Sequence, residues 1–278
     1  MKIRNKKEKI RNEGFSSEHL TFLKKQKRKK IIILACQTGL LVILAGLWEL
    51  LTYFNIMDPF ITSSPSRIFK TLGVLLSEGS LFKHIGVTLY ECVLGFVIAT
   101  ALGVVIAAAL WWSDTAKKIL DPYIVVLNSL PKVALGPIII IWVGLGSQAI
   151  IMMAVLISVI VTILSVLNGF LSCDKDKILL MRSMGANKGQ ILFKLILPHA
   201  LPDMISALKI NVGLSWVGTI MGEYLVSRAG LGYLIINGGL FFKLDIVMTS
   251  IVVLCVLAAI MYFGVAILEK WIYKRRRG

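Results

Sequence analysis

The chain of 278 residues is 57% hydrophobic and only 17% charged, and its mean hydropathy is +0.81. Soluble domains are nearer half apolar and a quarter charged, so this composition excludes a soluble enzyme, a disordered protein and a disulfide scaffold. The formal net charge of +16 does not indicate nucleic-acid binding, because 12 of the 31 basic residues lie in residues 1–30, directly before the first apolar run. Such a position is typical of the cytoplasmic side of a membrane protein, and a polyanion-binding tail is the lesser alternative.

Long uncharged stretches define the membrane spans. Residues 92–113, 133–173 and 246–268 contain 22, 41 and 23 residues without a charge. A bilayer core about 30 Å thick is crossed by about 20 apolar helical residues, so the middle stretch is long enough for two crossings. The sequence therefore predicts an all-α membrane protein. Its six predicted transmembrane helices cover roughly residues 31–53, 86–111, 119–142, 147–170, 204–226 and 246–269.

The third of these spans is predicted to be irregular. Asp121-Pro122 opens it, and Pro131 and Pro137 interrupt it. Proline removes a helical hydrogen bond and kinks the helix, which a membrane tolerates only where neighbouring groups or water satisfy the freed carbonyls.

The distribution of basic residues orients the spans. With the N-terminus inside, the cytoplasmic segments hold 24 lysines and arginines and the outside segments hold five. Because such residues accumulate on the cytoplasmic side, both termini are predicted to be cytoplasmic. The predicted organisation is a basic cytoplasmic tail (1–30), a first transmembrane helix (31–53), an extracytoplasmic segment (54–85), a five-helix core (86–270) and a basic cytoplasmic C-terminus (271–278).

The cytoplasmic loop 171–203 reads as structured. Asp174 or Asp176 can cap a short helix, which Gly185 then stops. Asn187, with Gln190 three residues later, forms a capping-box-like start for a second helix, and Leu197-Pro198 is expected to end it. The loop is therefore predicted to form two short helices on the cytoplasmic side, and an ordinary interfacial hairpin is the alternative interpretation.

The sequence offers no motif for catalysis. It contains no GxxxxGK[ST] to hold nucleotide phosphates, and no nucleophile–base constellation. The four cysteines and three histidines are scattered, so neither a metal site nor a cofactor is expected. ATP hydrolysis by this chain is accordingly not expected.

Polar residues inside the spans are costly and often functional, so they are candidates for lining a solute pathway. A structural role, such as a hydrogen bond between helices, is the alternative for each. The six candidates are Glu91, Asn128, Ser129, Asn211, Ser215 and Glu223.

Several motifs, in order along the chain, are those of one family. They are Trp48-Glu49-Leu50-Leu51, Leu130-Pro131-Lys132-Val133, Trp142-Val143-Gly144-Leu145-Gly146, Met184-Gly185-Ala186-Asn187, Ile196-Leu197-Pro198 and Gly230-Leu231-Gly232-Tyr233. Together they resemble the permease subunits of binding-protein-dependent ABC importers, in the nitrate/sulfonate/taurine subgroup. The glycine followed about a dozen residues later by Leu-Pro resembles the "EAA" loop of that family.

This resemblance implies a type I importer permease fold in the cell membrane, with loop 171–203 as the coupling element. It implies a homodimer in membrane lipid, two cytoplasmic ATPase subunits that drive transport, and an extracytoplasmic solute-binding protein, with no nucleic-acid partner. Its implied cargo is a small anion such as a sulfonate, nitrate or taurine. The residues implied to contact the ATPase are Arg182, Ser183, Met184, Gly185, Ala186, Leu197 and Pro198.

Two positions depart from the family pattern. The Glu-Ala-Ala of the family falls on Leu179-Leu180-Met181, so the acidic residue is absent. Glu91 stands where members of the subgroup often carry arginine, which indicates that solute or partner contacts differ here.

Two other classes of protein fit the six spans. An ATP-independent secondary carrier or channel would not need the structured loop and would usually show an internal repeat, which is not evident here. A membrane anchor or sensor that recruits partners through the basic tail would not need six spans with kinked helices.

Overall fold

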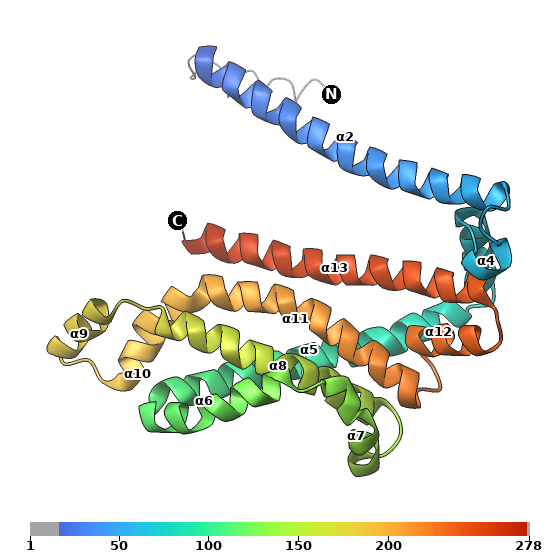
Figure 1. Cartoon of the computed structure of the whole chain (residues 1–278). Helices are drawn as coiled ribbons and strands as arrows, with labels where there is room; N and C mark the ends of the chain where they lie inside the picture. The colour runs from blue at the N-terminus through green and yellow to red at the C-terminus, as the bar shows by residue number, and fades with distance from the viewer. Residues whose placement is uncertain (1–16, 277–278) are drawn as a thin grey trace. The chain divides into compact units, whose positions relative to one another are not determined.

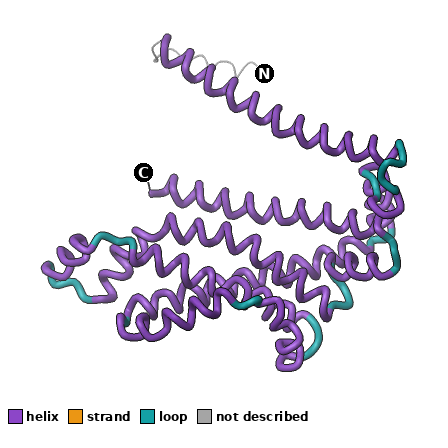
Figure 2. Tube along the Cα trace, in the orientation of Figure 1, coloured by secondary structure: helices purple, strands orange, loops and turns teal. Residues whose placement is uncertain are grey.

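A computed structural model describes residues 17–276, and every regular element within them is a helix (Figure 2). The chain separates into two compact units, residues 1–67 and 68–278, and each is described by itself. In the described part, five helices are long and apolar enough to cross a membrane, or six if one sharply bent pair counts as a single span. The predicted all-α membrane fold is confirmed.

In the first unit, α2 (Ser17–Tyr53) is one unbroken helix, and its residues Ile31–Tyr53 form the first apolar span. The basic residues from 17 to 30 therefore belong to the same helix as the span, and the rest of the predicted basic tail lies outside the described residues. The short helix α3 (Pro59–Thr62) follows. The Glu49 carboxylate accepts hydrogen bonds from the Ser66 backbone N at 3.0 Å and hydroxyl at 2.8 Å, so α2 is tied to the start of α4 (Pro65–Ser77).

In the second unit, α8 (Ser147–Leu171) packs along both α5 (Ser80–Trp112) and α11 (Leu197–Val226) (Figure 1). It is the most buried of the long apolar helices in the described part of the chain. In a membrane, helices associate through close packing and interhelical hydrogen bonds rather than through the hydrophobic effect. The packing around α8 is therefore what holds this unit together.

Small residues bring these backbones close. A Cβ atom added at Gly95 of α5 would lie 2.6 Å from the Cβ of Ala154 on α8. From α11, a Cβ at Gly218 would lie 2.5 Å from the Ala154 Cα, and one at Gly222 would lie 2.9 Å from the Ile150 Cα. Such distances leave no room for a side chain, so these glycines are required by the helix contacts.

The third predicted span is not one helix. It consists of α6 (Asp114–Ser129), the 3-10 helix η1 (Lys132–Leu135) and α7 (Gly136–Val143), and the two parts are bent by 89°. The prediction that Asp121-Pro122 opens it is wrong, because the Ser113 hydroxyl already caps the helix by accepting from Ala116 N at 3.2 Å. Pro122 lies inside α6, and the break falls at Leu130-Pro131, where the residue before proline takes an extended conformation.

The predicted end of the second loop helix at Leu197-Pro198 is also wrong. The helix α10 (Lys188–Ile191) continues through a π-helical turn, η2 (Leu192–Ile196), into α11, giving one helix of 39 residues from Lys188 to Val226. Pro198 lies in the first turn of α11. Its missing N–H is accommodated because the wide π turn directly before it already departs from the α-helical bonding pattern.

Two helices complete the second unit. The short apolar helix α12 (Leu231–Leu240) lies between the predicted fifth and sixth spans, in a stretch for which the sequence analysis predicts no helix. The predicted last span lies within α13 (Leu244–Arg276), so the basic residues up to Arg276 continue that helix, and 277–278 lie outside the described residues. Lys209 of α11 and Glu269 of α13 form an ion pair at 2.6 Å.

The glycine contacts of α8 give a first prediction. Gly218→Val would place a branched side chain against the α8 backbone, and overpacking of this kind lowers the free energy of unfolding by about 1–3 kcal/mol. Thermal unfolding of the purified protein in detergent measures the effect. Gly213→Val is the matched control on the same helix, because a Cβ there meets nothing within 4 Å. Equal midpoints for the two variants would contradict the proposed packing.

Candidate functional site

The loop between α8 and α11 begins with a capped helix. Asp174 is the N-cap of α9 (Lys175–Ser183), and its side chain accepts a hydrogen bond from Asp176 N at 2.9 Å. At the other end Gly185 has φ of +80°, with Gly185 N donating to Arg182 O at 2.9 Å and Ala186 N to Met181 O at 3.0 Å. These two bonds form a Schellman motif, which needs a left-handed residue at the position that Gly185 occupies. The predicted glycine stop is confirmed.

The second helix of the loop starts with a full capping box. Gln190 N donates to the Asn187 side chain at 2.8 Å, and Asn187 N donates to the Gln190 side chain at 2.9 Å. Both bonds satisfy backbone donors that a helix start otherwise leaves free. The turn between α9 and α10 is therefore fixed from both sides.

One side of this hairpin is anchored, and the other is exposed. Ile178, Met181 and Ala186 pack against the buried core that contains Phe170 and Ile191. Three other apolar side chains of the hairpin are 62–78% exposed: Leu179, Leu180 and Met184. Arg182, Ser183 and Gly185 are exposed as well. The hairpin thus presents a rigid, partly apolar surface.

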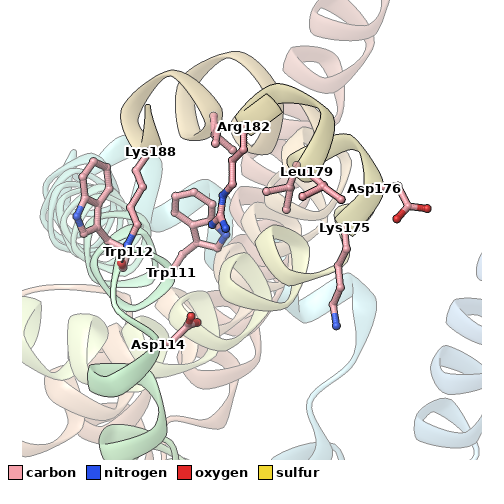
Figure 3. Close-up of a pocket in the computed structure, with 10 residues that line it drawn as sticks. Trp111, Trp112, Asp114, Lys175, Asp176, Leu179, Arg182 and Lys188 are labelled. Carbon is pink, nitrogen blue, oxygen red and sulfur yellow. Dashed lines mark hydrogen bonds between the residues drawn. The ribbon is translucent and has the colours of Figure 1, made fainter. Parts of the chain in front are cut away.

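A cavity of about 480 Å³ lies behind this hairpin, where it meets the ends of α5 and α6. The Arg182 side chain points toward Trp111 (Figure 3), and Lys188 Nζ donates to the Trp112 carbonyl oxygen at 3.4 Å. The cavity is lined by Trp111, Trp112, Asp114, Lys175, Asp176, Ile178, Leu179, Arg182, Lys188 and Ile191. Helices α5 and α6 therefore meet α9 and α10 around this cavity.

At the opposite end of the bundle, three side chains hold the start of α12. His84 Nδ1 accepts from Gly230 N at 2.9 Å, and the Thr88 hydroxyl accepts from Leu231 N at 2.7 Å. The Glu223 carboxylate accepts from Gly232 N at 2.5 Å and from the next backbone N–H. A carboxylate at a helix N-terminus is favourable because it meets free N–H groups and the positive end of the helix dipole.

Two of the predicted pathway residues hold helices together. The Asn211 amide donates to the Thr162 hydroxyl of α8, and also to Thr100 of α5 at 3.5 Å. Ser215 shares a hydrogen bond of 3.2 Å with Ser158 of α8. All four residues on α8 and α11 are buried. For Asn211 and Ser215 the structure therefore supports the structural role, a hydrogen bond between helices.

The other four candidates fall into two groups. Asn128 and Ser129 are exposed at the end of α6, where Lys132 Nζ donates to the Asn128 carbonyl at 2.9 Å. Glu91 and Glu223 are both 1% exposed and are neighbours. The structure therefore brings two of the six candidates together as a carboxylate pair between α5 and α11.

Within residues 17–276 there is no group of three or more metal-ligating side chains, and the four cysteines are free. Cys173 lies just outside α8, and burial raises the pKa of its thiol, which keeps it in the unreactive protonated form.

The sequence analysis did not single out several residues at the two ends of the bundle: Trp111, Trp112 and Lys188 at the hairpin, and His84, Thr88, Ser147 and Arg228 at the other end, where Ser147 and Arg228 line a second cavity. The two tryptophans and Lys188 lie at the ends of predicted helices, and this position could have indicated that they meet there. His84 and Thr88 accept hydrogen bonds from backbone N–H groups that lie 146 and 143 residues further along the chain. No local pattern indicates such a contact.

The long apolar helices and the rigid hairpin between two of them are those of a polytopic membrane transport component. Residues 92–278 match the family described as "Binding-protein-dependent transport system inner membrane component", and the chain belongs to this family. It is thus a multi-pass permease subunit of an ABC importer, which works with ATPase subunits and a solute-binding protein, and ATP is hydrolysed by the separate ATPase.

Curated relatives match over most of the chain. The taurine transport system permease protein TauC of Escherichia coli (strain K12) is 27% identical over 84% of this chain and 86% of its own length. The aliphatic sulfonates transport permease protein SsuC of Bacillus subtilis (strain 168), named as putative in function, is 26% identical over 86% of this chain and 87% of its own length.

Solved structures share the fold. A chain of the MetNI methionine ABC transporter, in an inward-facing conformation, matches with a TM-score of 0.58 and 22% identity over 73% of this chain and 98% of that chain. A chain of a bacterial alginate ABC transporter in complex with a periplasmic protein matches with a TM-score of 0.61 and 15% identity, over 87% of this chain and 97% of that chain. The predicted importer permease fold is confirmed, and the carrier or channel alternative is not supported.

The capping of α12 gives a second prediction. Glu223→Ala removes the acceptor for two backbone N–H groups, a loss of about 1–2 kcal/mol that corresponds to about tenfold faster local amide exchange. Hydrogen exchange measured by mass spectrometry on peptides covering residues 230–235 tests this. Glu223→Gln keeps one acceptor oxygen and is expected to show a smaller change. Unchanged exchange in the alanine variant would show that α12 is held by other contacts.

Proposed function

We propose that the exposed face of the α9–α10 hairpin is the surface on which the ATPase docks and through which it moves the membrane helices. The observation that carries this proposal is the combination of a doubly capped turn with an exposed apolar rim. A partner can transmit force only through an element that does not yield, and the caps around Gly185 and Asn187 make this turn such an element.

The continuity of the helix from Lys188 to Val226 supports a mechanical coupling. Its 39 residues correspond to a length of about 58 Å, enough to extend from the hairpin through the whole bilayer. The far end of this helix carries Glu223, which holds α12. A tilt imposed at the hairpin therefore reaches the other end of the bundle as a rigid-body movement.

Within the docking surface we assign Arg182, Ser183, Met184, Gly185 and Ala186 to ATPase contact. Leu197 and Pro198 are half-buried in the continuous helix, and their proposed role is to connect the hairpin to α11. Leu179 and Leu180 replace the acidic and small residues of the family motif and are 63% and 62% exposed. The groove of the partner ATPase is accordingly expected to be apolar at this point.

The proposed cargo is a small organic solute of the sulfonate or taurine type. Its support is the named transport of taurine and aliphatic sulfonates by relatives that match more than four fifths of this chain. We further propose that two copies of the chain form the translocation path within membrane lipid. The most apolar stretches of α2 and α13 contain no buried residue in the single chain, so both helices are free to contact lipid or a second copy of the chain.

Substitution at Gly185 tests the coupling element. Gly185→Val forces a branched residue into a left-handed conformation, at a strain of about 1–3 kcal/mol that changes the angle between α9 and α10. The variant should insert and fold, yet lose ATPase association and binding-protein-stimulated ATP hydrolysis in reconstituted vesicles.

Gly79→Val is the matched control, because Gly79 also has positive φ and a Cβ at either glycine meets nothing within 4 Å. Normal ATPase binding and uptake by the Gly185 variant would overturn the docking assignment. Transport by the reconstituted chain without any ATPase would instead favour the carrier interpretation.

The orientation of the chain is a separate proposal, based on the 24 basic residues in the inside segments against five outside. Both termini and the hairpin are expected to be cytoplasmic. A membrane-impermeant maleimide added to intact cells should modify Lys243→Cys, at the start of α13, and spare Ser183→Cys, at the end of α9. Both positions are exposed, so labelling of Ser183→Cys from outside would reverse the topology.

A further inference from the structure

The Glu91 side chain has an environment that the fold itself does not explain. It is 1% exposed within α5, and among the described residues neither carboxylate oxygen has a hydrogen-bond partner. Burying a carboxylate without a partner costs several kcal/mol in general. Its neighbour Glu223 is different, since one oxygen of Glu223 accepts two backbone N–H groups of α12. The other Glu223 oxygen also has no partner among the described residues, so Glu91, with two such oxygens, lacks more hydrogen bonds than Glu223 does.

Glu91 lines a cavity of about 460 Å³. This volume lies within the range of about 300–1,000 Å³ that is typical of small-molecule sites. Ser147 at the start of α8 and Arg228 after the end of α11 line the same cavity, and both are exposed. The cavity thus combines a buried carboxylate with an exposed guanidinium, two groups of opposite charge.

The position of the cavity fits a solute path. Helix α8 begins at Ser147 and α11 ends at Val226, whereas the α9–α10 hairpin joins the other ends of the same two helices. The cavity therefore lies at the end of the bundle opposite the proposed ATPase surface. A solute delivered from outside would meet Arg228 before Glu91.

We propose that this cavity binds a small zwitterionic solute, with its ammonium group on Glu91 and its anionic group on Arg228. The inference rests on the proposed permease function and narrows its cargo to amino-bearing anions. An ammonium group supplies the positive charge and donors that both oxygens of Glu91 lack. A guanidinium is suited to a carboxylate or sulfonate because it donates in pairs. An anion without an amino group would leave Glu91 uncompensated and meet two carboxylates.

The test uses charged probes on the assembled transporter. Ser147→Cys places a thiol in the cavity, and its reaction rates with the cationic trimethylammonium-ethyl and the anionic sulfonato-ethyl methanethiosulfonates are compared by peptide mass spectrometry. Glu91→Gln should lower the cation-to-anion rate ratio about tenfold, because one negative charge within a few ångströms is removed in a poorly screened place. Arg228→Gln should raise the ratio, and since Arg228 is exposed, this second variant does not depend on tolerance in the core. Asp176→Asn, in α9 at the opposite end of the second unit, is the control without effect.

Protection by solute identifies the ligand class. 2-Aminoethanesulfonate should slow the labelling of Ser147→Cys, and ethanesulfonate, which lacks the ammonium group, should need at least about tenfold higher concentration. Equal protection by both compounds, or a rate ratio that Glu91→Gln leaves unchanged, would overturn the zwitterion assignment. ATPase co-purification, measured on the same preparation, reports on the permease function separately: its loss would refute the proposed docking without bearing on the cavity.

Discussion

The close approach of α8 to α5 and α11 is the constraint on which the second unit depends. Backbone hydrogen bonds are satisfied inside each helix, so contact between helices has to come from shape. Gly95, Gly218 and Gly222 let three backbones meet at distances that a side chain would prevent. Because α8 begins at the cavity and ends at the hairpin, this packing fixes the separation of both regions.

The two regions also differ in how their polar groups are satisfied. At the hairpin, local bonds around Gly185 and Asn187 complete the backbone pairing within a few residues. At the other end, α12 depends on side chains from α5 and α11, and Glu91 remains without a partner among the described residues. A hairpin whose backbone hydrogen bonds are complete in itself suits a surface on which a partner protein exerts force. A region with unpaired polar groups, such as the one around Glu91, suits a site where a solute supplies the missing hydrogen bonds.

The sequence alone predicted those features of the fold that depend on residues close together in the chain. The Gly185 turn and the Asn187 capping box follow from side-chain and backbone chemistry within about four residues, and the structure has both. Pro198 was misinterpreted, since proline usually ends a helix, and only the π turn before it allows the helix to continue. The meeting of Glu91, Ser147 and Arg228 depends on three separate segments, so no local pattern contains it.

The π-helical turn at Leu192–Ile196 also sets the direction in which the hairpin faces. A π turn holds one more residue than the α-helical turn it replaces, and one residue corresponds to a rotation of about 100° around the helix axis. This single extra residue therefore sets the angle around the helix axis between the capped start at Asn187 and the bundle-facing residues of α11. In a homologous chain that lacks it, the same loop motif would point toward a different side of the bundle, although every cap and every span were retained.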